Sequence, residues 1–159
     1  MLPEREVLSA ISKHRSEGKT IVFTNGCFDL LHPGHIKLLE FAKSKGDILV
    51  VGLNTDDSVR RLKGETRPIV GEKDRAIVLS ALEHVDYVVL FDEDTPLKLI
   101  EKVLPHVLVK GQDYTRETVV GHEIVEGHGG RVELSPLVEG LSTSKIVDRV
   151  KRRHDTNYE

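Results

Sequence analysis

The sequence predicts a Rossmann-like doubly wound α/β fold with a parallel sheet in a single domain. Short apolar, strand-like runs alternate with helix-like segments, and the connections between them are short. No segment rich in Pro, Gly or Ser divides the chain. Strict alternation requires right-handed crossovers, which make the strands parallel and place helices on both faces of the sheet. A length of 159 residues with 38% hydrophobic content suits one domain over 1–159, with its core at about 20–150.

The first half of the chain begins with an amphipathic helix over 4–16, because Val7, Leu8 and Ile11 recur at helical spacing. Apolar, β-branched runs then predict two strands, since fully buried parallel strands carry few polar residues. The strands are expected at 20–24 and 48–53, and the helices at 35–45, 56–62 and 72–82.

The second half repeats the alternation three more times. Short apolar runs again predict strands, and helical periodicity predicts the segments between them. The strands are expected at 87–90, 107–110 and 131–134, and the helices at 96–103, 117–126 and 143–152. The polar residues 154–159 are expected to fray.

Composition narrows the range of partners. The formal net charge is -3, from 23 Lys and Arg against 26 Asp and Glu, so the chain lacks the positive field that nucleic acids or anionic membranes attract. The single cysteine, Cys27, excludes an internal disulfide and indicates a reducing compartment. No apolar run reaches membrane-spanning length. We therefore expect a cytoplasmic protein without nucleic-acid or membrane partners, in which Cys27 serves packing.

The carboxyl end of the first strand is the most informative segment, because ligands of such sheets bind at strand ends. A strand that passes through a glycine turn into a helix presents free backbone N–H groups to phosphate, and two histidines stand there. A helix start or half of a zinc site is the alternative, but the other histidines lack metal-ligand spacing, so we predict no metal-binding residues. The predicted nucleotide-binding residues are Thr24, Asn25, Gly26, Phe28, Asp29 and Gly34, and the predicted catalytic residues are His32 and His35.

The second strand ends at Asn54, a possible site residue, and a basic loop follows at 61–68. This loop is poor in apolar residues, which suits a cover over a bound triphosphate. Lys63 is its predicted catalytic residue, and an exposed solubilising lysine is the alternative. Asp29 and Arg75 either face the ligand crevice or form structural ion pairs.

Two later strand ends complete the predicted site. Polar groups after the fourth strand are expected to contact the base, and a hydroxyl-rich helix start after the fifth forms either an ordinary N-cap or a second anion site. The predicted nucleotide-binding residues there are Lys110, Gly111, Asp113, Tyr114, Ser142, Thr143 and Ser144.

Two of these motifs carry a resemblance that covers about 20–150. His32-Pro33-Gly34-His35 and the late Ser142-Thr143-Ser144-Lys145 resemble signatures of the cytidylyltransferase-like nucleotidyltransferase superfamily. Within it, segments 23–26, 61–68, 92–96 and 109–114 are most similar to the heptose 1-phosphate adenylyltransferase domain of bacterial ADP-heptose synthase, although Gln112 replaces a usual glycine.

The resemblance implies an enzyme that joins ATP to D-glycero-D-manno-heptose 1-phosphate, giving ADP-heptose, a lipopolysaccharide precursor, and pyrophosphate. It also implies Mg²⁺ with the ATP, a separate sugar kinase upstream and a homodimer. Glycerol-3-phosphate cytidylyltransferase is an alternative, but that family carries arginines where this chain has Glu83 and Leu137. An FAD synthetase-type enzyme and a non-catalytic nucleotide-binding regulator on the same fold are further alternatives.

Overall fold

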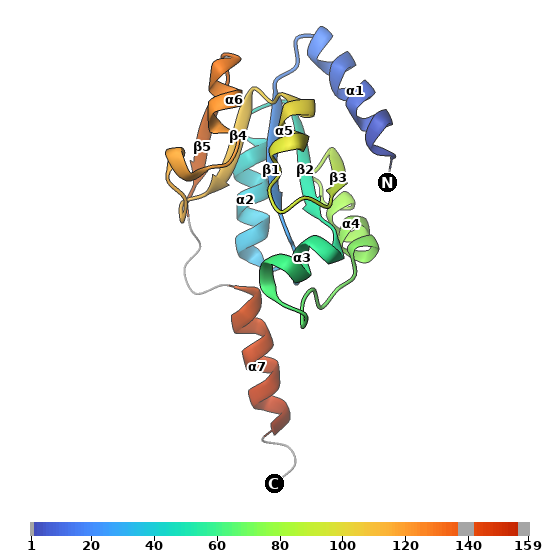
Figure 1. Cartoon of the computed structure of the whole chain (residues 1–159), viewed down its shortest axis with the longest axis vertical. Helices are drawn as coiled ribbons and strands as arrows, with labels where there is room; N and C mark the ends of the chain where they lie inside the picture. The colour runs from blue at the N-terminus through green and yellow to red at the C-terminus, as the bar shows by residue number, and fades with distance from the viewer. Residues whose placement is uncertain (1, 137–141, 156–159) are drawn as a thin grey trace.

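A five-stranded parallel sheet forms the centre of the protein and carries helices on both faces (Figure 1). The computed structural model describes residues 2–136 and 142–155. All neighbouring strands pair in parallel, in the order β3-β2-β1-β4-β5. The strands are β1 (Ile21–Gly26), β2 (Ile48–Asn54), β3 (Tyr87–Phe91), β4 (Val107–Gly111) and β5 (Arg131–Ser135). The predicted fold class is confirmed.

Two hydrophobic cores lie on opposite faces of this sheet. Successive side chains of a strand point to opposite faces, so Phe23 of β1 joins one core and its neighbour Val22 the other. The first core is covered by α1 (Glu4–Ser16), α5 (Leu97–Val103) and α6 (His122–Gly127), and the second by α2 (Pro33–Lys43) and α4 (Glu72–Ser80).

The strand order places the ligand crevice. β1 lies between β2 and β4, so the winding of the chain reverses beside it. At such a switch point the connections leave adjacent strands in opposite directions and open a crevice at their carboxyl ends. The residues that follow β1 and β4 are therefore brought together.

One predicted helix is wrong. The segment 117–126 forms a short 3₁₀ turn, η1 (Arg116–Thr118), and then the separate helix α6. Gly121, between them, has φ 89°, a left-handed conformation that a right-handed helix cannot contain. A Cβ at this position would lie 2.8 Å from Cδ1 of Ile100, so close packing also requires glycine.

Several helix ends also differ from expectation. The helix predicted at 35–45 is α2, which begins at Pro33 because His32 caps it, and α4 ends at Ser80 rather than residue 82. Strand β1 continues to Gly26, which keeps Asn25 within the sheet.

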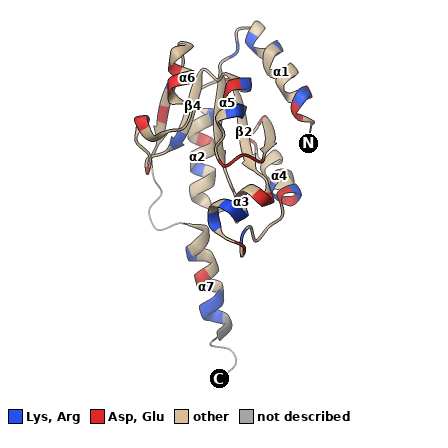
Figure 2. Cartoon of the chain, viewed as in Figure 1, with Lys and Arg blue, Asp and Glu red and all other residues tan. Residues whose placement is uncertain are grey.

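The last helix, α7 (Thr143–Asp155), extends away from the sheet (Figure 1). It continues to Asp155, so fraying does not begin at residue 154 as predicted, and residues 156–159 lie outside the described part of the chain. No helix within residues 2–136 and 142–155 is long and apolar enough to cross a membrane. Acidic and basic residues are interspersed over most elements (Figure 2), as the near balance of charges implies.

Candidate active site

A cavity of about 560 Å³ lies at the carboxyl ends of the strands. It collects residues from the ends of all five strands and the segments that follow them, which are far apart in the sequence. The predicted site residues that line it are Asn25, Gly26, Phe28, Asp29, His32, Gly34, His35, Asn54, Lys63, Lys110, Gly111, Asp113, Tyr114 and Thr143.

His32 caps helix α2 with its own ring. Its Nδ1 accepts a hydrogen bond from the backbone N–H of Gly34 at 3.1 Å. An accepting Nδ1 is unprotonated, so the proton of the neutral ring resides on Nε2. Burial lowers the pKa of His32 and favours this neutral form. His32 is thus held as a hydrogen-bond donor at the start of a helix, where the N-terminal end of the helix dipole favours anions.

His35 packs beneath His32 in the first turn of α2. The two rings stack with centroids 3.9 Å apart and planes inclined by 25°, and the Phe28 ring lies 5.2 Å from His35. Burial, with smaller contributions from His32 and Lys63, lowers the pKa of His35 to about 4. Its Nδ1 is buried and has no hydrogen-bond partner among the described residues. Since buried polar atoms are normally paired, this nitrogen is suited to a ligand.

This low pKa predicts a loss of stability in acid. His35 binds a proton near pH 6.5 in the unfolded chain but only near pH 4 in the native protein. The unfolded state therefore binds more protons between these values, and the free energy of unfolding falls as the pH drops from 7 to 4, by at most about 3 kcal/mol before screening by water. Urea unfolding at several pH values should show a shallower decline for His35→Asn than for the wild type. Equal slopes would contradict the assignment.

Lys63 ends helix α3 (Asp56–Lys63) and lines the cavity. The next residue, Gly64, has a positive φ of 94°, and it turns the chain away from the helix. Its positive charge lowers the pKa values of both His35 and Cys27, so it lies within electrostatic range of both. The side chain is exposed, as the solubilising alternative also requires, but it stands at the cavity wall.

Asp29 anchors the base of the loop that follows Lys63. Its carboxylate accepts hydrogen bonds from Arg67 at 2.8 Å and from the backbone N–H groups of Ile69 at 2.8 Å and Val70 at 2.9 Å. Burial alone would raise its pKa, but these three donors hold the pKa below its usual value. Asp29 borders the cavity, yet its oxygens are bound by the protein, which supports the ion-pair alternative.

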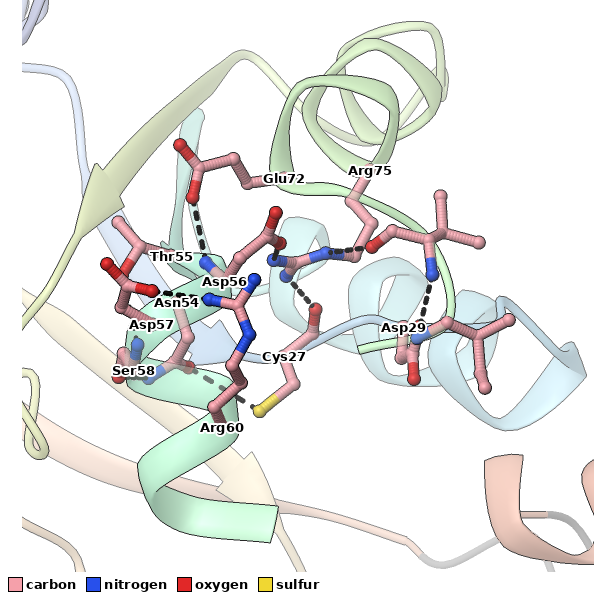
Figure 3. A network of polar contacts seen from close by, with 12 residues as sticks. Cys27, Asp29, Asn54, Thr55, Asp56, Asp57, Ser58, Arg60, Glu72 and Arg75 are labelled. Carbon is pink, nitrogen blue, oxygen red and sulfur yellow. Dashed lines mark hydrogen bonds and ion pairs between the residues drawn. The ribbon is translucent and has the colours of Figure 1, made fainter. Parts of the chain in front are cut away.

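Arg75 also binds the segment 69–70 that Asp29 anchors (Figure 3). It is buried, and its guanidinium donates to the carbonyl oxygens of Val70 at 2.8 Å and Cys27 at 2.5 Å and to Asp56 at 2.8 Å. Arg75 does not line the cavity, which supports the ion-pair alternative for this residue over one that faces the ligand. Its contacts join the turn after β1 and the start of α3 to α4, which carries Arg75.

Besides Arg75, three predicted residues lie outside the cavity wall: Thr24, Ser142 and Ser144. Thr24 is buried within β1. Ser142 accepts a hydrogen bond from the backbone N–H of Lys145 and thus acts as the ordinary N-cap, and Ser144 lies 3.5 Å from Arg67. Thr143 does line the cavity, and its hydroxyl donates to the carbonyl oxygen of Leu30 at 3.2 Å. Leu137 lies outside the described residues.

Sequence reasoning missed several wall residues. Asp94, Thr95 and Pro96 follow the carboxyl end of β3, so the rule used for the other strands would have found them. Cys27, expected to serve packing, is half-buried at the cavity, and burial raises the pKa of its thiol. The same rule points to Ser135 and Pro136, which follow the strand predicted at 131–134, and Leu62 belongs to the predicted loop 61–68. No sequence signal pointed to the remaining wall residues, Leu38 and Val120.

The described side chains contain no group of three or more His, Cys, Asp or Glu placed to hold a metal ion. Two of the cavity carboxylates have protein partners: Asp29 is bound as above, and Asp94 pairs with Arg61 at 2.8 Å. Such a cavity, with few unpaired carboxylates, fits an ion that is held mainly by phosphate and water oxygens, as Mg²⁺ commonly is.

Comparisons with known proteins agree with this geometry. The sequence profile of the cytidylyltransferase-like family matches residues 23–149. The chain is 58% identical to the bifunctional protein HldE of Pelobacter propionicus, in a match that covers 96% of this chain and 32% of the relative. It is 63% identical to HldE of Citrifermentans bemidjiense, in a match that covers 89% of this chain and 29% of the relative. The chain thus spans about a third of the length of these curated relatives.

A solved structure is similar as well. It is a lipopolysaccharide core biosynthesis protein from Thermoplasma volcanium, with a TM-score of 0.62 and 31% identity over 76% of this chain and 98% of that one.

Proposed function

This chain belongs to the cytidylyltransferase-like family of nucleotidyltransferases, and from that membership we propose that it transfers the adenylyl group of ATP to D-glycero-D-manno-heptose 1-phosphate. The products are ADP-heptose and pyrophosphate. The observation that carries nucleotidyl transfer is the stacked pair of neutral histidines at the start of α2, in one cavity with Lys63 and the first turn of α7. The similarity to HldE and to a lipopolysaccharide core biosynthesis protein supports the sugar.

In the proposed reaction, a phosphate oxygen of the sugar attacks the α-phosphorus of ATP as the bond to the pyrophosphate oxygen breaks. The attacking oxygen is already anionic, so no general base is required. Catalysis then consists of positioning the reactants and stabilising the charge that develops on the transferred and leaving phosphates. His32 and His35 donate hydrogen bonds to the triphosphate, and Lys63 neutralises the α-phosphate. The N-termini of α2 and α7 add backbone N–H groups directed at the outer phosphates.

We propose that Mg²⁺ accompanies the ATP. When bound, it would neutralise charge on the phosphate oxygens, with water completing its coordination. Asp94 and Asp113 line the cavity, and their carboxylates would accept hydrogen bonds from those waters. Titration of magnesium into the protein with and without ATP tests this, and tight binding without nucleotide would contradict it.

A screen of pyrophosphate release tests the proposed function. Four nucleoside triphosphates are each combined with heptose 1-phosphate, glycerol 3-phosphate and FMN. We expect release with ATP and heptose 1-phosphate, because similarity over most of the chain favours that pair. Robust release with CTP and glycerol 3-phosphate, or with ATP and FMN, would identify one of the alternatives. Nucleotide binding without release from any pair would indicate a regulator.

The cellular setting is also proposed. The protein works in the cytoplasm as a homodimer and receives heptose 1-phosphate from a sugar kinase. Light scattering during size-exclusion chromatography tests the dimer, and a mass near 17.8 kDa would contradict it.

A further inference from the structure

We propose that Lys110 binds the phosphate of the acceptor, and thereby makes the cavity select a phosphorylated, hydroxyl-rich acceptor over its unphosphorylated form. This inference rests on the proposed nucleotidyl transfer and assigns Lys110 a role different from the nucleotide contact expected from sequence. It follows from where the ammonium group lies, from what it lacks, and from the geometry of an in-line reaction.

Lys110 lies near the carboxyl end of β4, one residue before the strand ends. Its side chain is partly buried in the cavity wall. Its Nζ donates to the carbonyl oxygen of Asn25 at 3.2 Å and lies 5.2 Å from the centre of the Tyr114 ring. Both contacts leave the full positive charge without a balancing negative charge.

No described carboxylate lies within ion-pair distance of this ammonium group, whereas the cations behind the cavity are paired, Arg67 with Asp29 and Arg75 with Asp56. Burial lowers the pKa of Lys110 to about 8, although the charges of Asp113 and Cys27 act in the opposite direction. A partly buried cation without a counterion is costly to the protein. An anionic ligand at this point would remove that cost.

Among the described residues, Lys63 and Lys110 are the lysines that line the cavity, and they come from different sides of β1. Both Lys63 and Lys110 lower the pKa of Cys27, but Lys63 also acts on His35. Lys63 comes from the helix after β2, and Lys110 comes from β4, and these strands flank β1 on opposite sides. An in-line displacement requires the attacking and leaving oxygens on opposite sides of the phosphorus. With the histidines and Lys63 holding the triphosphate, Lys110 is placed for the attacking phosphate.

A second group beside Lys110 fits the hydroxyls of such an acceptor. The side-chain oxygen Oδ1 of Asn25 is buried and has no hydrogen-bond partner among the described residues, and Asn25 lines the cavity. An oxygen of this kind can only accept, so its natural partner is a donor such as a hydroxyl. An anion site and a hydroxyl site therefore adjoin at the end of β1 and β4.

Steady-state kinetics of Lys110→Met and Lys110→Arg test the proposal. We expect Lys110→Met to raise KM for heptose 1-phosphate roughly 10-fold or more while KM for ATP stays within about twofold, on the scale of a lost charged hydrogen bond. Lys110→Arg, which keeps the charge, should recover most of the affinity. Lys37→Met is the matched control, because Lys37 is an exposed lysine of α2 that pairs with Glu40. A rise in KM for ATP with an unchanged KM for the acceptor would overturn the proposal.

The pH profile provides a readout that a structural role would not change. Above pH 8 Lys110 loses its charge, so KM for the acceptor should rise in the wild type and stay flat in Lys110→Arg. The groups that face Lys110 are Asp113, Cys27 and Tyr114. Cys27→Ser should keep the rise in KM but begin it at slightly lower pH, because the thiol no longer raises the pKa of Lys110. The acceptor phosphate is already dianionic because its second pKa is near 6. A profile that disappears in Cys27→Ser would overturn the assignment.

Calorimetry separates this proposal from the proposed function. Heptose 1-phosphate is titrated into the protein saturated with a non-hydrolysable ATP analogue. Binding by the wild type that weakens 10-fold or more in Lys110→Met supports the phosphate site, whether or not turnover is seen. Equal binding by the two proteins, or no binding by the wild type, would overturn it. Failure of the wild type to release pyrophosphate would instead count against the proposed function alone.

Discussion

Replacing His35 by alanine is expected to lower kcat by two or more orders of magnitude while the protein remains folded. The neutral ring has a buried nitrogen without a partner and stacks on His32, so it is held in place before the substrate arrives. Removing one preorganised donor to a developing charge costs about 10²-fold to 10³-fold in rate. Single-turnover measurement of pyrophosphate release, which separates chemistry from product release, checks the prediction.

His128→Ala is the matched control for this experiment. His128 is exposed and does not line the cavity, and its ring nitrogen Nδ1 is bonded to the carbonyl oxygen of Ile124 at the end of the same helix. Its replacement should leave kcat unchanged. Circular dichroism and thermal unfolding should show that His35→Ala retains the native fold. A folded His35→Ala protein with a near wild-type rate would disprove the catalytic assignment.

Replacing Arg75 by methionine is expected to cost roughly 3 kcal/mol of stability. Methionine fills much of the same volume but leaves Asp56 and the carbonyl oxygens of Cys27 and Val70 without their donor. Removal of one partner from a buried, hydrogen-bonded ion pair typically costs about 3 to 5 kcal/mol, and Asp56 is partly exposed, so the lower end applies. The melting temperature should fall by about 6 to 12 °C for a chain of this size.

Arg60→Met provides the comparison. Arg60 lies one turn after Asp56 on α3. It pairs with Asp57 at the surface, as Figure 3 shows. An exposed pair of this kind contributes about 0.3 to 0.5 kcal/mol, so its loss should barely move the urea unfolding midpoint. Similar losses for the two variants would mean that the buried network is not what holds the loop.

The element order could be predicted because it depends on local patterns. Each strand is a short apolar run, and a strand's burial on both faces is visible in its composition. The break before α6 could not be predicted in this way, because glycine also occurs inside helices and Gly121 alone does not mark a helix end. Its left-handed backbone and the close approach of Ile100 from the neighbouring helix are both set by tertiary structure.

The candidate site divides along the same line. The rule that ligands bind at strand ends located His32, His35 and Lys110, because it depends only on where strands stop. The roles of Asp29 and Arg75 depended instead on partners 40 and 48 residues away, such as Ile69 for the first and Cys27 for the second. No local pattern distinguishes a carboxylate that binds a ligand from one that binds a distant backbone.

The placement of α7 separates folding from catalytic competence in the order of synthesis. None of the described residues of α7 belongs to either hydrophobic core, and all five strands are complete at Ser135. Yet Thr143 forms part of the cavity wall and bonds to the turn after β1. A ribosome-bound chain can therefore complete its sheet before its active site exists. The site is completed only when the first turn of α7, which follows the sheet in the sequence, reaches the cavity.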